Sequence, residues 1–540
     1  MKKFLSVVLA FTLVFSMFAT SSSASEGSKW NENNVCNNGD CEYYPTIIIP
    51  GLGQSNNWVL DDNGEYVLDS DGNRTAAFPG VMDIGAIIKT AIVPLLLSVA
   101  TQSDMGFSDA VADIINVIFG INKCDEYGQP SKNVYTERFT RPLSEYTAEE
   151  KEGPYHHVPL NLHESSFSED HLYYFSYNSF GNHIDITKEL YDYIHMVMEQ
   201  TGHDKVIISP ISQGGTLSNS LFEYYPDIMD CIAKVLYIVP CLDGTTLIGD
   251  IFSDKIRLLD PDVLYTGLLS TFFDVETASM IETLVRILPD EVLMKGLEKG
   301  VGVLVNDIMT MSTSMWAMCD SASYPEAAEL HLKDRPELKK QTDKYYEAQL
   351  NSNKNIQKLV DKGVEVITVA EYDIQMYGVG ESYDKEMADG MIPLASTAMG
   401  TYAANIGETL PEGYKQANSS VNCSDPKNHN HISHDNVVDA STGLLPDTTF
   451  YFDGQKHEQT AKNTTILTLA LRIIENKITD VYSDPAYPQF ITCPPYPAPE
   501  EGFFTKLSDT LYEYFGTNGF SEIPGVAIRN LFKPITELFS

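Results

Sequence analysis

Short apolar runs recur along the chain and are separated by stretches with helical periodicity. Each run is rich in β-branched or aromatic residues, and near-continuous apolar runs are typical of parallel strands that are buried on both faces of a sheet. We expect strands over residues 46–50, 173–177, 205–209, 234–239, 364–369 and 448–452.

Helical patterns fill the intervals between these strands. Apolar residues at helical spacing predict a helix over residues 184–199, and a second helix over residues 217–225 ends at Pro226. The alternation of strand and helix predicts an α/β protein with a mostly parallel central sheet and helices on both faces.

Two long segments interrupt the alternation. In residues 60–167, the pairs Asn63-Gly64 and Asp71-Gly72 predict hairpin turns, and apolar helices are expected near residues 84–100 and 108–119. Residues 244–350 are largely helical and apolar. Because ligands of open α/β sheets bind at the carboxyl ends of the strands, a helical insertion there is expected to form a cap or lid. A buried helical subdomain without a lid function is the alternative.

The two ends of the chain differ from the body. A basic start, an apolar stretch and a small-residue end indicate a cleaved signal peptide over residues 1–25 and a secreted protein, with an uncleaved membrane anchor as the alternative. The main α/β domain is expected over residues 26–480. Residues 481–540 then form a Pro-rich linker and a helical tail, which docks on the protein or lies on a lipid surface.

Charge and cysteine content narrow the possible partners. The 75 acidic and 36 basic residues leave a formal charge of −39, which repels phosphate backbones, so nucleic acid is not an expected partner. Eight cysteines in an exported chain permit disulfides, and Cys36 and Cys41 are the favoured pair. The oligomeric state does not follow from the sequence.

A candidate nucleophile lies in the run Val206-Ile-Ile-Ser-Pro-Ile-Ser-Gln-Gly-Gly-Thr216. A strand leads into Ser212, and Gly214 and Gly215 let a helix start at once, so the serine is expected on a sharp strand-to-helix turn. The helix N-terminus there favours developing negative charge. Pro210 occupies the place of the first glycine of the G-x-S-x-G pattern, and a serine that merely caps a helix is the alternative.

The loop after the first strand supplies candidate oxyanion donors. Acyl transfer needs two preorganised N–H groups, one from the residue after the nucleophile and one from an earlier strand-ending loop. Here these are the backbone N–H groups of Gln213 and of Leu52 in Pro50-Gly-Leu-Gly53. An ordinary strand-ending turn is the alternative for this loop.

Two later strand ends complete a candidate triad. Asp373 follows the strand at 364–369, and His457 follows the strand at 448–452, so the chain order is Ser, Asp, His, as in α/β-hydrolases. His457 would act as general base and Asp373 would orient its ring. Asp243 and Asp439 are competing acids, and His434 is a competing base.

These motifs resemble those of secreted α/β-hydrolases of the lipase and esterase type. Residues 172–225, with Tyr173-Tyr-Phe-Ser-Tyr-Asn178, resemble lecithin:cholesterol acyltransferase-like lipases. Pro50-Gly-Leu-Gly53 and Ser212-Gln-Gly-Gly215 are similar to the oxyanion loop and nucleophile turn of fungal lipase B-type enzymes, which also replace the first glycine. The resemblance implies an α/β-hydrolase fold and covers about half of the chain.

The resulting prediction is a cofactor-independent serine hydrolase of carboxylic esters. Its expected partners are small-molecule or lipid esters, with transient contact to lipid aggregates. A short-chain esterase, an acyltransferase with the same triad and a non-catalytic binding protein are the alternatives. Three histidines near Cys423 (His429, His431 and His434) could bind a metal, but their spacing matches no defined motif, so no metal is expected.

Overall fold

The computed structural model describes residues 42–69, 72–78, 90, 93–95, 97–98, 101–162, 165–257 and 288–496. The expected signal peptide, the Cys36–Cys41 pair, most of the helix expected near residues 84–100 and the C-terminal tail lie outside these residues. Within them, we find no helix that is both long and apolar enough to cross a membrane.

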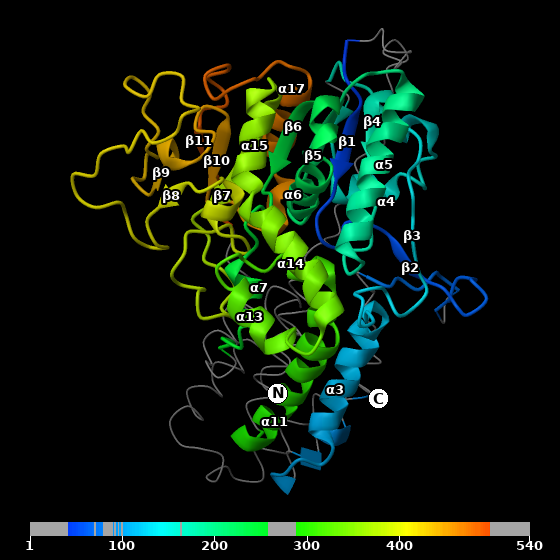
Figure 1. Ribbon diagram of the computed structural model, residues 1–540. Helices are drawn as coiled ribbons and strands as arrows, with labels where there is room; N and C mark the ends of the chain where they lie inside the picture. The colour runs from blue at the N-terminus through cyan, green and yellow to red at the C-terminus, as the bar shows by residue number, and fades with distance from the viewer. Residues whose placement is uncertain are drawn as a thin grey trace.

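A seven-stranded sheet forms the centre of the molecule (Figure 1). Its strand order is β11-β10-β7-β6-β5-β1-β4, and every neighbouring pair is parallel. The α/β-hydrolase fold class is therefore confirmed. The strands are β1 (Thr46–Ile49), β4 (Leu172–Tyr174), β5 (Val206–Pro210), β6 (Ile232–Ile238), β7 (Glu365–Tyr372), β10 (Thr449–Asp453) and β11 (Phe490–Thr492).

Each predicted strand has a counterpart in this sheet, and β11 is an additional edge strand that the sequence did not predict. Because β11 pairs with β10, the sheet extends past residue 480, where the domain boundary was expected.

Helices cover both faces of the sheet (Figure 1). On β5, Val206 and Ile208 belong to the apolar cluster that includes Leu190 and Leu221, whereas Ile207 belongs to the cluster that includes Ile473. Each such side chain contributes about 1.5–3 kcal/mol when fully buried. The two faces are covered by α5 (His183–Thr201), α6 (Gly214–Tyr224) and α15 (Ser352–Asp361) on one side and by α17 (Thr464–Ile474) on the other.

The first insertion starts with antiparallel structure. Strand β2 (Asn57–Val59) pairs with β3 (Val134–Thr136). A bridge between Leu60 and Tyr66 flanks the predicted Asn63-Gly64 turn, and a bridge between Leu68 and Arg74 flanks the second predicted turn, whose Asp71 lies outside the described residues. The predicted helix at 108–119 is α3 (Phe107–Phe119). The insertion also contains η1 (Gly120–Asn122), η2 (Leu143–Glu145) and α4 (Glu152–His157), and η4 (Glu169–His171) leads into β4.

The second insertion packs against the first one. Lys295 of α11 (Asp290–Val301) contacts Asp104 at 2.6 Å, next to α3, and Gly296 lets α11 approach Phe107 closely. Between β5 and β7, the described residues also form η5 (Pro226–Cys231), which precedes β6, and α7 (Thr246–Phe252), η7 (Gly302–Asn306), η8 (Met309–Met311), α12 (Thr313–Trp316), α13 (Tyr324–His331) and α14 (Pro336–Leu350).

The apolar cluster of these two insertions includes Leu52, Phe180 and Cys241, which follow the carboxyl ends of β1, β4 and β6. The helical layer therefore covers that edge of the sheet, as expected of a cap. Its action as a lid stays a prediction.

The segment between β7 and β10 is long and mostly irregular. It contains α16 (Leu394–Thr397), the antiparallel pair β8 (Tyr402–Ala403) and β9 (Val438–Asp439), and η9 (Ala440–Thr442); η10 (His457–Lys462) follows β10. Both the acid and the base of the candidate site come from these connections.

Candidate active site

Ser212 lies on the turn between β5 and α6. Its φ of 50° is in the left-handed region, which strains a residue that carries a side chain and is characteristic of functional turns. The strained backbone is bonded to β6 and the residues after it: the N–H of Ser212 donates to the carbonyl of Ile238 at 3.1 Å, and its carbonyl accepts from the N–H of Cys241 at 2.9 Å. The predicted sharp strand-to-helix turn is therefore present at Ser212.

The glycines after Ser212 are required by close backbone approach. A Cβ at Gly214 would lie 2.4 Å from the carbonyl oxygen of Ile49, and one at Gly215 would lie 2.8 Å from the backbone nitrogen of Cys241. Any side chain at these two positions would force α6 away from the sheet.

Pro210 is accommodated because the ladder does not need its N–H. The β5–β6 ladder runs to Ile208 and resumes only at Ile211, and the bond to the carbonyl of Ile49 comes from the N–H of Ile211 at 2.9 Å. Proline at the end of this strand therefore stiffens the approach to the turn.

His457 lies between Ser212 and a buried carboxylate. Its Nε2 is 2.9 Å from Ser212 Oγ, and its Nδ1 is 2.8 Å from Asp389 Oδ2. A carboxylate can only accept a hydrogen bond, so Nδ1 carries the proton and the lone pair of Nε2 faces the serine hydroxyl. Ser212, His457 and Asp389 thus have the geometry of a Ser-His-Asp triad.

Burial and charge act in opposite directions on His457. Burial alone would lower the pKa of His457, but the adjacent Asp389 carboxylate outweighs it by charge and hydrogen bonding and raises the pKa above the ordinary 6.5. The stabilised imidazolium suits a base that takes up a proton during a reaction.

The predicted acid, Asp373, is corrected to Asp389. Asp373 does follow β7, but it is exposed in a left-handed turn, and its neighbouring charges are Asp435 and Asp453. The chain then makes an excursion and returns at Asp389, whose backbone carbonyl also accepts the N–H of His457 at 2.9 Å. The prediction failed because it placed the acid directly at the strand end.

A local signal for Asp389 exists in the sequence. It precedes Gly390, which has a φ of 100°, and its Oδ1 accepts the N–H groups of Met391 at 2.9 Å and Ile392 at 2.7 Å. Such a side-chain-to-backbone turn is typical of Asp before Gly. It fixes Oδ1 and leaves Oδ2 for His457.

The backbone N–H groups on either side of Leu52 are already engaged in hydrogen bonds. Gly51 N–H donates to Gln54 Oε1 at 2.7 Å, and Gly53 N–H donates to Ser179 Oγ at 2.9 Å. By contrast, no described residue accepts a hydrogen bond from the N–H of Leu52 or from that of Gln213. Both groups are therefore available to an acceptor from outside.

Residues after β4 connect the loop after β1 to the turn that carries Ser212. The hydroxyl of Tyr177 donates to the carbonyl of Pro50 at 2.8 Å and lies 3.2 Å from Gln213 Oε1, and Gln213 Nε2 donates to the carbonyl of Ser179. Tyr177 is buried, so these bonds tie the Pro50–Gly53 loop to the turn that carries Ser212.

A second buried acid, Glu371, lies near Asp389 and His457 and was not predicted from the sequence. Burial and then the charge of Asp389 raise the pKa of Glu371 well above its ordinary value, and Thr460 Oγ1 donates to its Oε1 at 2.8 Å. Both effects favour the neutral form of Glu371, which adds no negative charge beside His457.

A pocket opens beside Ser212 and His457. It extends between the sheet and α17 and is bordered by the end of α4. Ser212 and His457 belong to its lining, and most of the lining residues are apolar, including Val158, Leu160, Ile238, Leu467 and Ala470. Such a lining suits a hydrocarbon chain whose polar end meets Ser212.

The competing acids and the competing base named from the sequence do not contact Ser212 or His457. Asp439 accepts from Tyr414 and Ser441, the backbone N–H of the exposed Asp243 donates to Ser396 Oγ, and the ring of His434 lies against that of Phe490. His429 and His431 meet Cys423 and Asp447 in a second cluster of side chains that could hold a metal.

Fold and geometry together define a protein of the α/β-hydrolase fold with a Ser-His-Asp arrangement at the carboxyl edge of its sheet. No protein-family model matches the chain, and no curated protein matches it. It is similar to the crystal structure of the Tle4–Tli4 complex, with 11% sequence identity, a TM-score of 0.32, and coverage of 81% of this chain and 99% of that chain. A likeness this distant bears on neither family nor chemistry, so the lipase resemblance stays a prediction.

Proposed function

We propose that the protein is a secreted serine hydrolase that cleaves carboxylic esters, with acyl lipids as the substrate class. The observation that carries this proposal is the continuous contact from Ser212 Oγ through the His457 ring to Asp389, at 2.9 and 2.8 Å. It supports a nucleophile with its base and orienting acid already aligned.

In the proposed mechanism, Ser212 Oγ attacks the ester carbonyl while His457 Nε2 takes its proton. The resulting oxyanion accepts hydrogen bonds from the N–H groups of Leu52 and Gln213. His457 then returns the proton to the departing alcohol, which leaves an acyl group on Ser212. Water, deprotonated by His457, releases the acid and restores the serine.

The acyl-lipid assignment rests on the apolar pocket. An acyl group on Ser212 could extend along the wall formed by Ile238, Leu467 and Ala470, where each buried methylene contributes about 0.8 kcal/mol. Activity should therefore increase with acyl length until the pocket is filled. The cap over the carboxyl edge of the sheet adds further apolar surface near this site.

The test is a series of p-nitrophenyl esters of increasing acyl length, assayed with the wild type and with Ser212→Ala. Active-site labelling with an alkyl fluorophosphonate, followed by peptide mass spectrometry, identifies the nucleophile. We expect turnover and labelling at Ser212 in the wild type and neither in the variant.

Equal, slow hydrolysis of every ester by both proteins would contradict the enzyme assignment, and labelling at another serine would contradict the nucleophile. A preference for the shortest esters would replace the acyl-lipid assignment with a short-chain esterase. Retained folding of Ser212→Ala is checked by circular dichroism.

A further inference from the structure

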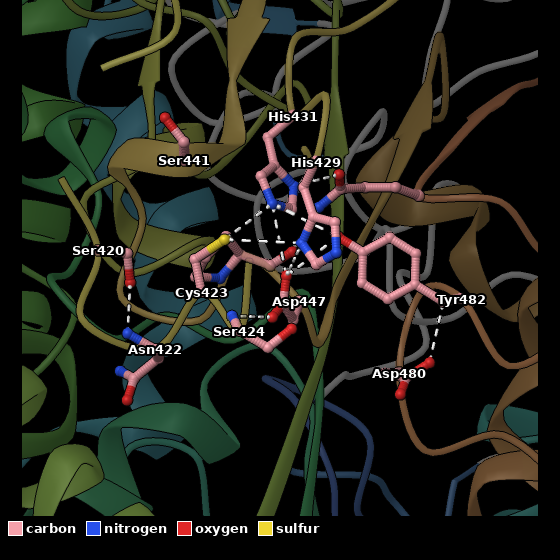
Figure 2. A network of polar contacts seen from close by, with 12 residues as sticks. Ser420, Asn422, Cys423, Ser424, His429, His431, Ser441, Asp447, Asp480 and Tyr482 are labelled. Atoms are coloured by element: carbon pink, nitrogen blue, oxygen red, sulfur yellow. Dashed lines mark hydrogen bonds and ion pairs between the residues drawn. The ribbon is translucent and has the colours of Figure 1, made fainter. Parts of the chain in front are cut away.

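Four metal-binding side chains converge in the segment before β10 (Figure 2). Cys423, His429 and His431 come from one irregular loop, and Asp447 lies 2 residues before the start of β10 at Thr449. One ligand atom from each of the four residues lies within 4.8 Å of every other. The two histidines are those noted in the sequence, and Asp447 is the ligand that local spacing could not supply.

The distances between these atoms fit the edges of a metal tetrahedron. Cys423 Sγ is 3.7 Å from His429 Nδ1 and 3.4 Å from His431 Nε2. Asp447 Oδ1 is 3.3 Å from the same His429 nitrogen and 3.4 Å from the same His431 nitrogen. Usual zinc bond lengths in a tetrahedron give about 3.6 Å for S···N and about 3.3 Å for N···O.

Hydrogen bonds to Gln489 orient His431 toward the centre of the cluster. Gln489 Nε2 donates to the carbonyls of Pro446 and Thr449, so its Oε1 faces His431 Nδ1 at 2.8 Å and must accept a proton from it. In the neutral ring, Nε2 then presents a lone pair to the cluster. This is the usual outer-shell arrangement of a metal-bound histidine.

A lone pair in that position is satisfied by a positive partner, which is either a proton or a metal ion. The neutral His431 Nε2 faces Asp447 Oδ1, which is also an acceptor, and the His431 side chain is fully buried. The hydroxyl of Tyr482 is nearer to Asp447 Oδ1, at 3.1 Å, than to His431 Nε2, at 3.5 Å. A cation among the four atoms would satisfy all of the lone pairs together.

The Asp447 carboxylate is also oriented by a hydrogen bond from outside the cluster. Asp447 Oδ2 accepts the N–H of Ser424 at 2.6 Å, which leaves Oδ1 directed at the two histidines (Figure 2). The ring of His429 packs on the ring of Tyr482 with centroids 4.3 Å apart, which fixes its plane. Three of the four donors, His429, His431 and Asp447, are thus positioned by contacts outside the cluster.

We propose that Cys423, His429, His431 and Asp447 bind one Zn²⁺ ion in a tetrahedral structural site. Sulfur, nitrogen and oxygen donors in this geometry favour zinc over the octahedral, all-oxygen ions. One thiolate, one carboxylate and two neutral imidazoles balance the two charges of the ion. The thiol proton of Cys423 is released to solvent on binding. Four protein ligands leave no open position, so the ion takes no part in catalysis.

The site connects elements that otherwise have little regular structure between them. The ion closes the loop from Cys423 to Asp447 and ties it to the start of β10, the strand that leads to His457, while Gln489 joins it to the strand β11 at the edge of the sheet. Zinc should therefore stabilise the fold, independently of whether the proposed esterase activity is correct.

The test is metal analysis of the purified mature protein, followed by replacement with cobalt. We expect one zinc per chain by mass spectrometry. The cobalt form should show the visible bands of tetrahedral Co²⁺ and a near-ultraviolet thiolate-to-cobalt band. Cys423→Ser should lose the thiolate band and bind zinc more than about tenfold more weakly.

Matched controls come from the same region. His434→Gln removes a histidine of the same loop that is not among the four donors, and Cys493→Ser removes another half-buried thiol; both should keep the metal and the spectrum. Absence of bound zinc after loading and dialysis, or a thiolate band that persists in Cys423→Ser, would overturn the proposal. If Cys423→Ser does not fold, the wild-type cobalt spectrum decides between a tetrahedral thiolate site and none.

Discussion

His457 contacts two oxygen atoms whose requirements differ. Ser212 Oγ must give up a proton to Nε2, and Asp389 Oδ2 must hold the proton on Nδ1. Both contacts are buried, so water cannot substitute for either partner at low cost. The identity of the acid therefore decides how well the histidine works.

We predict that Asp389→Asn lowers kcat for a short-chain ester by about 10³–10⁴-fold, because the amide can no longer hold the productive tautomer. Asp373→Asn is the matched control and should stay within about threefold of the wild type, since Asp373 does not contact His457. Steady-state kinetics on both variants checks this. The reverse ranking of the two variants would restore Asp373 as the acid.

The pH profile tests the charge on His457. Only neutral His457 can accept the serine proton, so kcat/KM should rise with pH through the pKa of His457. That pKa lies above the ordinary 6.5, because Asp389 outweighs the effect of burial. The acid limb of wild-type kcat/KM should therefore have its midpoint above pH 6.5.

In Asp389→Asn, burial remains but the carboxylate charge is lost, so the pKa of His457 should fall. The acid limb of the residual activity should then move to lower pH than in the wild type. An unchanged midpoint would mean that another group controls the limb.

At the scale of elements, the junction of β5 and α6 depends on backbone contact. Helix α6 starts so close to β1 that a Cβ at Gly214 would meet the Ile49 carbonyl. The same close approach brings the helix N-terminus to Ser212, where its N–H groups favour negative charge. Stability and activity should therefore be affected together at this position.

We predict that Gly214→Ala destabilises the protein by about 1–3 kcal/mol and lowers kcat, because α6 must move away from the sheet. Gly120→Ala is the control: its φ is −62°, and its Cβ would make only ordinary contacts, the nearest at 3.7 Å. Urea unfolding and ester kinetics measure both effects. A loss of activity in Gly214→Ala without destabilisation would argue against this strain mechanism.

The elements differ in how far the sequence alone could predict them. The central strands were predictable because both faces of the sheet are buried, which makes runs such as Val206–Ile208 continuously apolar. Strand β11 is 3 residues long and lies at the edge, so its pattern is too short to recognise.

The residues of the candidate site also differ in how far the sequence alone could predict them. Ser212 and His457 directly follow buried strands and could be predicted from position. Asp389 lies at the end of an irregular excursion after β7, and Asp447 joins the Cys423 loop only in three dimensions. Neither placement is encoded by local periodicity, because loop geometry depends on packing between distant segments.

On the scale of the whole molecule, charge and a few buried carboxylates set the response to acid. At neutral pH the formal charge of −39 produces self-repulsion, which protonation relieves as the pH falls. Buried carboxylates that accept several hydrogen bonds act in the opposite direction, since they stabilise the fold only when ionised.

Glu475 is such a group, located just after the end of α17. Its Oε1 accepts from Ser165 Oγ and from the N–H and hydroxyl of Ser166 at 2.6–2.8 Å, and Lys477 contacts its Oε2 at 2.8 Å. Burial alone would raise the pKa of Glu475, but Lys477 and the two serines outweigh it and lower the pKa from 4.5 to about 2. Ionised Glu475 therefore ties the segment before β4 to the end of α17.

Because the folded-state pKa of Glu475 is lowered, its contribution is complete above pH 4.5 and is lost as the pH falls towards about 2. We predict that Glu475→Gln is less stable than the wild type at pH 7 by at most about 3 kcal/mol. The difference should shrink steadily below pH 4.5. Self-repulsion changes equally in both proteins, so their difference in urea unfolding free energy, measured from pH 7 to pH 3, isolates Glu475. Glu149→Gln, at an exposed position, should match the wild type throughout, and a pH-independent deficit in Glu475→Gln would assign the effect to packing and not to charge.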